Sequence, residues 1–261
     1  GGGGGAIVIS GSSTVEPISS RVAELFDDAG NTASITVDGP GTGDGFELFC
    51  AGETDISDAS RPIKAEEAEN CEANGIEFIE LQVAYDGMAV LTNANNDAVE
   101  CLSFEDLYAL MGPESTGFSN WSDAQDLAIS EDDAATTRPD YSSQSNDNAI
   151  LSGIEGSDSS FGWVGFAFAE EAGDSVKELE IQNEDGECIA PTAETIADGT
   201  YPLSRSLYIY VNAGNAESNT TLVDYVDFYL GDGYAAVEEV GYIPLPADLL
   251  AETQATWDAR T

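Results

Sequence analysis

A succession of strands, turns and helices in the first part of the chain most constrains its fold. Apolar segments typical of strands recur at residues 7–9, 34–37, 55–57, 76–83 and 88–93. Between them, amphipathic helices are predicted at residues 15–29 and 44–51, with Ser13 or Thr14 as the N-terminal cap of the first. This order predicts an α/β fold with a mostly parallel sheet and helices on its faces.

Three of these strands lead into turns of glycine and small hydroxyl residues, at residues 10–14, 39–45 and 58–62. Two of the turns precede a predicted helix. Uncapped backbone amides and the positive end of a helix dipole favour negative charge. The sequence therefore predicts an oxyanion site where these turns meet.

The charge of the chain excludes some partners. Fifty acidic residues stand against seven basic ones, which gives a formal net charge of −43 over 261 residues. Such a surface repels nucleic acids and anionic membranes. A halophile-like adaptation, in which salt screens the repulsion, and a solubility adaptation of a secreted protein both fit this composition.

The chain contains four cysteines and no histidine. Without CxxC spacing or histidine, a metal site is not expected, and no cofactor is expected. The even count favours two disulfides, with free thiols as the alternative. Of three connectivities we favour Cys50–Cys71 and Cys101–Cys188.

The length suits two lobes rather than one core. No apolar run approaches the ~20 residues of a membrane span, and the five N-terminal glycines are typical of a linker. No flexible linker interrupts the rest, so we expect the lobes to share crossing strands, near residues 84–87 and 205–209. Lobe I then comprises residues 1–84 and 208–261, and lobe II residues 85–207.

Several segments together resemble the phosphate-binding proteins of phosphate ABC transporters, the PstS-like branch of the periplasmic-binding-protein family. They are Ile-Ser-Gly-Ser-Ser-Thr-Val-Glu-Pro-Ile at 9–18, the glycine turn through Ser-Asp-Ala-Ser-Arg-Pro at 41–62, Asp-Gly-Met-Ala-Val-Leu-Thr-Asn at 86–93, Phe-Gly-Trp-Val-Gly-Phe at 161–166 and Tyr-Pro-Leu-Ser-Arg at 201–205. The resemblance covers nearly all of residues 6–261. It implies two lobes joined by two crossover strands, each a mixed and mostly parallel sheet flanked by helices.

The resemblance also implies a function. It describes an extracytoplasmic solute-binding protein, periplasmic or anchored at the cell surface as a lipoprotein. Such a protein captures inorganic phosphate and delivers it to an ABC permease, acts as a monomer and is not an enzyme. The alternative is a surface or assembly protein that keeps the fold without transport.

The family's ligands can be carried over to positions in this chain. The first turn offers Ser13, Thr14 and Val15, the second offers Thr42, and the third offers Ser60 with Arg61 beside it. Some members use an Asp in the third turn as acceptor for the phosphate hydrogen. We expect Ser60 in its place here, and Asp86 as the acceptor instead. Sulfate has no hydrogen to donate, so such a carboxylate excludes it.

One expected element is missing. The family's second lobe carries an arginine or charged neighbour, then a Ser-Gly-Thr turn at a helix start. Only residues 129–137 occupy the expected place. Either the turn is lost or about 30 residues are absent from the sequence there.

Other signals have ordinary structural interpretations. Arg61 is either an ion-paired scaffold residue or a phosphate ligand, and structural roles are favoured for Arg138 and Arg205. The aromatic residues at 161–168 are expected in the core. An esterase using Ser13 or Ser60 lacks a histidine base and a paired acidic metal motif.

Overall fold

The chain forms two compact units, described here from a computed structural model. Unit 1 comprises Gly1–Asp86 and Arg205–Thr261, and unit 2 comprises Gly87–Ser204. The expected boundaries, after residues 84 and 207, differ from these by two and three residues. The structure describes residues 5–119, 121–124, 137–142 and 147–260. None of the helices within these ranges is both long and apolar enough to cross a membrane.

Unit 1 is built on a mixed sheet, whose order is β11-β4-β10-β3-β1-β2. Strand β1 pairs in parallel with β2 and β3, whereas β3 pairs antiparallel with β10, and β4 antiparallel with β11. The strands are β1 (Ala6–Gly11), β2 (Ser34–Asp38), β3 (Ile56–Ala59), β4 (Phe78–Asn93), β10 (Ser204–Asn212) and β11 (Ile243–Pro244). The sheet is thus parallel where strands and helices alternate, as the sequence predicts.

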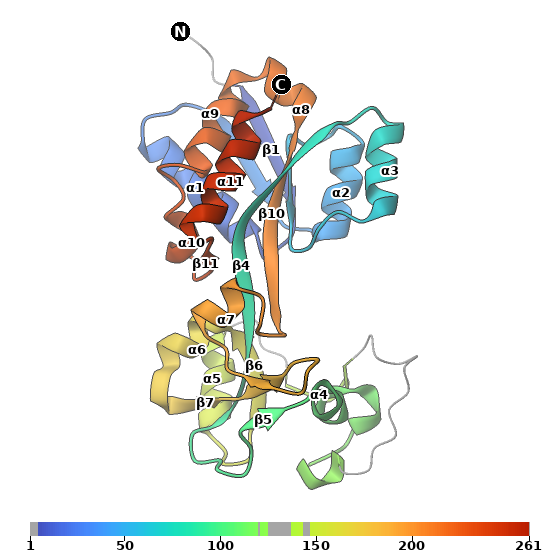
Figure 1. Cartoon of the computed structure of the whole chain (residues 1–261), viewed down its shortest axis with the longest axis vertical. Helices are drawn as coiled ribbons and strands as arrows, with labels where there is room; N and C mark the ends of the chain where they lie inside the picture. The colour runs from blue at the N-terminus through green and yellow to red at the C-terminus, as the bar shows by residue number, and fades with distance from the viewer. Residues whose placement is uncertain (1–4, 120, 125–136, 143–146, 261) are drawn as a thin grey trace. The chain divides into compact units, whose positions relative to one another are not determined.

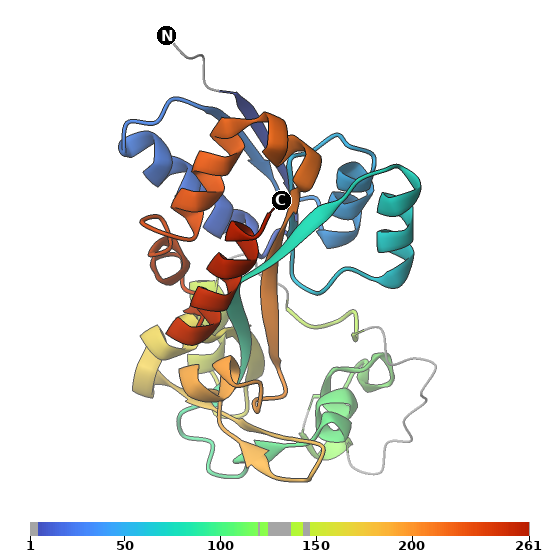
Figure 2. The same ribbon diagram turned by 45° about the horizontal axis from the view of Figure 1, so that its top comes forward.

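Helices cover both faces of this sheet (Figures 1 and 2). One face carries α2 (Thr42–Cys50) and α3 (Ala65–Ala73). The helices grouped on the other side are α1 (Glu16–Asp28), α8 (Ala213–Ser218), α9 (Thr220–Tyr229), α10 (Ala236–Glu239) and α11 (Ala247–Asp258). The last helices of the chain thus belong to unit 1.

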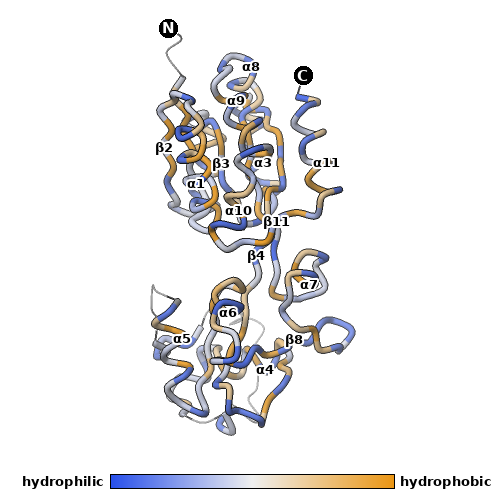
Figure 3. The backbone as a smooth tube through the Cα atoms, turned by 90° about the vertical axis from the view of Figure 1, so that its left-hand side faces the viewer, coloured by the Kyte–Doolittle hydropathy of each residue, from blue (hydrophilic) through white to orange (hydrophobic). Residues whose placement is uncertain are grey.

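The two faces have separate apolar cores. The larger buries Ile7 and Ile9 of β1 with Ile18 and Val22 of α1, and with the tyrosines and tryptophan of α9 and α11. Helical spacing of these apolar residues leaves polar residues outside, so unit 1's helices alternate between hydrophobic and hydrophilic segments in Figure 3.

The smaller core packs α2 and α3 against β3 and β10, around Phe46, Phe49 and Tyr210. The Cys50–Cys71 disulfide joins α2 to α3 within it. In unit 2, Cys101 is joined to Cys188. The pairing expected from the sequence is confirmed.

Strand β4 differs from the sequence-based expectation of a break between two strands. Instead of two strands separated at residues 84–87, the chain forms one continuous strand of 16 residues. Its first part pairs with β11 through Ala84 and Tyr85, and its last part with β6 and β7. Pairing on both sides of Asp86-Gly87 maintains the extended backbone through a dipeptide that is typical of turns.

Unit 2 is mainly antiparallel, contrary to the expected mostly parallel sheet. Strand β4 pairs antiparallel with β6 and β7, and β8 antiparallel with β9; only β5 with β8 is parallel among the described pairs. The strands are β5 (Cys101–Leu102), β6 (Phe161–Gly165), β7 (Val176–Glu178), β8 (Glu180–Gln182) and β9 (Cys188–Ile189). The helices are α4 (Phe104–Met111), α5 (Asp147–Glu155), α6 (Phe166–Ala172) and α7 (Ala193–Ala197), with 3-10 turns η1 (Pro113–Ser115), η2 (Trp121–Ala124) and η4 (Gly173–Ser175).

The aromatic strand β6 also differs from expectation. Its buried positions are Gly162 and Val164, whereas Phe161 and Trp163 are only half-buried. A Cβ on Gly162 would lie 3.1 Å from Ile154 of α5, so a larger residue at this position would require Ile154 to shift. Side chains alternate between the two faces of a strand. The large rings of Phe161 and Trp163 therefore lie on the opposite face, outside the core.

Candidate functional site

The first turn, between β1 and α1, is organised by Ser12. The Ser12 amide donates to the Asp58 carbonyl at 2.8 Å, and the Ser12 carbonyl accepts from the amides of Val15 and Glu16. The Ser12 hydroxyl accepts from the Thr14 amide at 3.2 Å. The cap position is therefore Val15, without a side-chain cap, and the expected cap at Ser13 or Thr14 is wrong.

This arrangement decides which groups of the first turn remain available. The amides of Thr14 and Val15 are already used, and the Val15 side chain is fully buried in the larger core. Within the described chain, Ser13 has no hydrogen-bond partner for its amide or hydroxyl. Ser13 and the hydroxyl of Thr14 are thus better placed than Val15 to meet a ligand.

Close backbone approach holds the first two turns together. Gly41 donates its amide to the Gly11 carbonyl at 2.8 Å. Gly11 has φ of +153°, and a Cβ there would overlap the Asp58 carbonyl oxygen, so only glycine fits. A Cβ on Gly45 would likewise overlap the Gly11 backbone. Glycines at these positions bring α2 against the end of β1.

The second and third turns meet through two hydroxyls. Thr42 and Ser60 lie with their Oγ atoms 3.1 Å apart, and the Ser60 amide donates to the Thr42 Oγ1 at 3.2 Å. Thr42 is also the first residue of α2, whose first intrahelical bond runs from the Gly45 amide to the Gly41 carbonyl. The amides of residues 42–44 precede that bond and are the donors an anion uses at a helix start.

Asp58, which the sequence analysis did not select, is the main chemical feature of unit 1. It lies in β3 opposite Gly11 of β1 and is fully buried. The Ser19 hydroxyl of α1 donates to its Oδ1 at 2.9 Å, whereas its Oδ2 has no hydrogen-bond partner in the described chain. A buried carboxylate oxygen without a donor is costly unless something supplies one.

The surroundings of Asp58 disfavour its negative charge. Burial raises the pKa of this carboxyl to about 7; the Ser19 hydrogen bond opposes the shift, and the charges of Glu16 and Asp38 add to it. The hydroxyls of Ser10 and Ser57, on the same two strands, are also buried without partners. The third turn thus does contain an acidic residue, two positions before Ser60. The expectation that Ser60 takes the place of the family's acidic residue stays a prediction.

Asp86, the expected acceptor, is instead ion-paired. The Arg205 Nε donates to Asp86 Oδ2 at 2.9 Å, and Nη2 lies 2.8 Å from the same oxygen. Nη2 also donates to the Thr14 Oγ1 at 3.0 Å. Burial raises the pKa of the Asp86 carboxyl, and Arg205 opposes the shift. Arg205 thereby connects Asp86 to the first turn.

Arg61 does not join this group. Its guanidinium donates to both carboxylate oxygens of Glu67 on α3, at 2.8 and 2.6 Å, and lies over the Phe46 ring. Glu67 raises the pKa of Arg61 further. Of the two interpretations of Arg61, this geometry favours the ion-paired scaffold.

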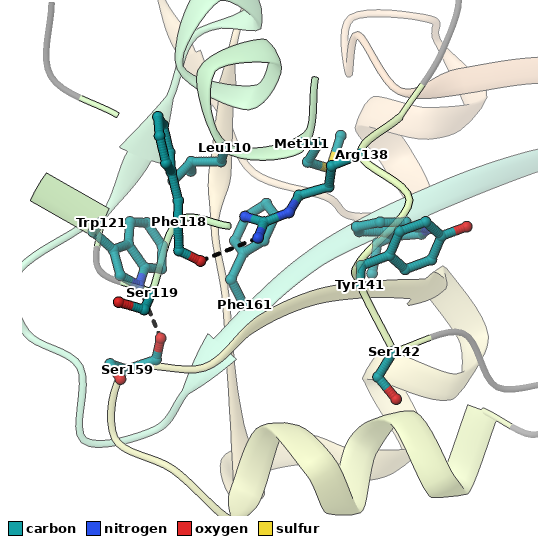
Figure 4. A pocket seen from close by; sticks show the side chains of 11 residues that line it. Leu110, Met111, Phe118, Ser119, Trp121, Arg138, Tyr141, Ser142, Ser159 and Phe161 are labelled. Atoms are coloured by element: carbon teal, nitrogen blue, oxygen red, sulfur yellow. Dashed lines mark hydrogen bonds between the residues drawn. The ribbon is translucent and has the colours of Figure 1, made fainter. Parts of the chain in front are cut away.

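In unit 2, Arg138 lies in a pocket of about 270 Å³ lined by aromatic side chains (Figure 4). Asp140 accepts from Arg138 Nε and Nη2 at 2.6 and 2.9 Å, and the Phe118 carbonyl accepts from Nη2 at 3.1 Å. The Arg138 pair holds the pKa of Asp140 well below its usual range. Five rings line this pocket, those of Phe118, Trp121, Tyr141, Phe161 and Trp163.

The Arg138 segment can be compared with the arginine and Ser-Gly-Thr turn expected in the second lobe. Helix α5 begins at Asp147, five residues after Ser142. An arginine followed by a serine shortly before a helix is the arrangement sought for the second lobe, although without the Ser-Gly-Thr letters. The place of the expected loss, residues 129–137, lies outside the described residues except for Thr137.

Comparisons with known proteins agree with this architecture. Residues 1–232 match the model of the PBP superfamily domain. The chain is 35% identical over 268 residues to Protein SphX of Synechocystis, covering 93% of this chain and 79% of that protein. It is 32% identical to the phosphate-binding protein PstS of Staphylococcus saprophyticus, covering 98% and 85% of the two chains.

A solved structure agrees as well. A possible phosphate binding protein from Planctomyces limnophilus superposes with a TM-score of 0.88 at 33% identity, covering 98% of this chain and 99% of that one. The match extends over unit 1 and unit 2 alike. The chain therefore belongs to the PBP superfamily, and within it to the family of PstS-like phosphate-binding proteins.

Proposed function

We propose that this chain captures inorganic phosphate and delivers it to an ABC permease. The observation that carries the proposal is the unpartnered Oδ2 of Asp58, buried where the first turn meets β3. Hydroxyl and amide donors lie on the adjoining turns. A ligand that both accepts and donates hydrogen bonds satisfies both sets of groups, and a protonated phosphate is such a ligand.

The donor side of the site consists of the turn residues. Ser13 and Thr14 in the first turn, Thr42 at the start of α2 and Ser60 in the third turn offer hydroxyls, and α2 offers its first amides. Neutral donors fixed in advance bind an anion without bringing in buried charge. This set retains four of the residues expected from the sequence and leaves out Val15, Arg61 and Asp86.

The acceptor side is Asp58. A phosphate that keeps a hydrogen near neutral pH donates it to the carboxylate, whereas sulfate brings only a bare oxygen. Placing like charges together without a shared hydrogen is unfavourable, so the same carboxylate excludes sulfate. Asp58 thus takes the selectivity role first expected of Asp86.

Within unit 2, we propose that Arg138 is an anion ligand. Asp140 fixes the Arg138 guanidinium through two donors and leaves Nη1 without a partner in the described chain. An arginine held this way presents its remaining donor in a fixed direction, as anion recognition requires. We expect Arg138→Gln to weaken phosphate binding.

The family consists of solute-binding proteins rather than enzymes, and we propose the same for this chain. The sequence contains no histidine to act as a base. The one Cys/Glu group that could hold a metal among the described residues, Cys101, Glu180 and Cys188, includes a disulfide. Two disulfides support a location outside the cytoplasm, and we propose that the protein acts there as a monomer.

Isothermal titration of the full chain with phosphate in high-salt buffer tests the function. High salt screens the repulsion between an anion and the acidic surface. We expect saturable heat with one phosphate per chain, and a raised melting temperature. Absence of both would contradict the proposal and favour the surface-protein alternative.

A further inference from the structure

Arg205 is the one basic side chain of unit 1 that contacts the first turn. Unit 1 contains five basic residues, all described. The other four make ion pairs elsewhere: Arg21 with Glu24 and Glu239, Arg61 with Glu67, Lys64 with Glu66, and Arg260 with Asp227 and Asp258.

The turns of unit 1 need such a charge. Their donors are neutral, whereas the charges of Glu16 and Asp38 lie near enough to Asp58 to raise the pKa of its carboxyl. A phosphate dianion placed among these carboxylates meets net negative charge. Phosphate binding therefore requires a cation close to the turns, because the α1 dipole alone supplies only part of the positive charge needed.

The contacts of Arg205 suit that task. Its Nη2 reaches the Thr14 hydroxyl at 3.0 Å, and its Nη1 has no partner in the described chain. Because the Thr14 oxygen accepts from Arg205, its own hydrogen is left to donate to an anion. The guanidinium and the hydroxyl thus present donors side by side.

Asp86 fixes the direction of this guanidinium. Its carboxylate accepts from Nε and lies against Nη2, on the edge of the fork away from Nη1. The Asp86 side chain is 18% exposed and that of Arg205 is 47% exposed, so the anchor is sheltered and the cation is open to solvent. A sheltered carboxylate holding a more exposed arginine is a way to position it before a ligand arrives.

Resting on the phosphate-binding function proposed above, we infer that Arg205 is a further phosphate ligand of unit 1, positioned by Asp86. Asp86 comes at the end of the first segment of unit 1, and Arg205 begins the second. The ion pair joins residues 119 positions apart, at the two places where the chain passes between the units. Phosphate bound to Arg205 therefore contacts a residue at one of these passages.

Titration of the full chain with phosphate tests this inference, comparing wild type with Arg205→Gln, Arg205→Lys and the control Arg21→Gln. Arg21 also lies in unit 1, but it is ion-paired with Glu24 and Glu239 and does not contact the first turn, so its loss removes the same charge elsewhere. We expect Arg205→Gln to weaken binding about 10- to 100-fold, the range for a charged hydrogen bond. We expect the phosphate affinity of Arg205→Lys to lie between those of wild type and Arg205→Gln, and that of Arg21→Gln to equal the wild-type affinity.

Two further measurements separate a ligand from a merely structural arginine. Affinity for phosphate should depend less on salt concentration in Arg205→Gln than in Arg21→Gln, because one charge no longer faces the anion. The melting temperature without phosphate should be similar in the two variants. If Arg205→Gln binds phosphate with wild-type affinity, or if its affinity depends on salt as strongly as that of Arg21→Gln, the role of Arg205 is contradicted but the proposed function is not. If the wild type does not bind phosphate, the proposed function itself is contradicted.

Discussion

Two carboxylates border the first turn of unit 1 in opposite environments. Asp58 is fully buried, receives one hydrogen bond from Ser19 and forms no ion pair with the residues that the structure describes. Asp86 is partly exposed and is held by Arg205. The Oδ2 of Asp58 has no donor among the described residues, so a ligand could supply one, whereas the Asp86 carboxylate already accepts from Arg205. On our proposal, the neighbouring cation, and not closeness to the turn alone, distinguishes the acid that selects the ligand from the acid that does not.

The largest expected effect concerns the stability of unit 1 at different pH values. The folded-state pKa of Asp58 is about 7, above its ordinary value of 3.8. Well below pH 3.8 the carboxyl is protonated in both the folded and unfolded states. As pH rises toward 7 the unfolded chain releases this proton first, so stability falls, by at most about 4 kcal/mol.

Urea unfolding of wild type and Asp58→Asn without phosphate, between pH 4 and 8, measures this effect. The asparagine does not titrate, so we expect the difference in unfolding free energy between the two proteins to grow with pH in favour of the variant. A difference that stays constant over this range would show that Asp58 titrates normally. Taking the difference cancels the titration of the other acidic residues.

Selectivity is the next largest effect. We expect Asp58→Asn to lower phosphate affinity about 100-fold, since a charged buried hydrogen bond is lost. Its affinity for sulfate should not fall, because the repelling charge is gone. Competition titrations of both anions give the ratio, and an unchanged ratio would place the selectivity elsewhere.

A smaller effect is expected at the second and third turns. Thr42→Ala removes the hydroxyl that contacts Ser60 but keeps the α2 amides. We expect about a tenfold loss of phosphate affinity, as for one hydrogen bond to a charged group. Glu47→Ala, on the exposed side of α2, is a matched control that should bind like wild type.

The smallest effect should be that of Asp86→Asn on selectivity. Asp86 is satisfied by Arg205, so its replacement leaves the preference for phosphate over sulfate unchanged, even where affinity shifts. The same competition titrations measure it. A relaxed preference in this variant would reverse the roles of the two carboxylates.

The sequence predicts much of unit 1, for a local reason. Glycines at strand ends, small hydroxyls and helical periodicity are local signals, and the strand and helix order they predict is observed. The sequence predicts a break in β4 because Asp86-Gly87 has the composition of a turn, and this prediction is wrong. Pairing with β11 and β6, which are distant in sequence, keeps the strand extended.

The candidate site is harder to predict than the order of strands and helices, because the burial of a side chain depends on residues that are distant in sequence. Asp58 occurs in Ile-Ser-Asp-Ala, and its environment depends on Ser19 of α1 and the buried Tyr225 and Tyr229 of α9. One signal was available, since Ile56 and Asp58 lie two apart in a strand and so share a face. No comparable signal links Arg205 with Asp86, 119 residues away.

The most direct test of the account is equilibrium dialysis of the full chain with labelled phosphate against a large excess of unlabelled sulfate, in high-salt buffer. The account predicts that bound phosphate is unaffected by sulfate in wild type and in Asp86→Asn, and is displaced in Asp58→Asn. Displacement by sulfate in wild type, or retention in Asp58→Asn, would contradict the claim that Asp58 selects the ligand.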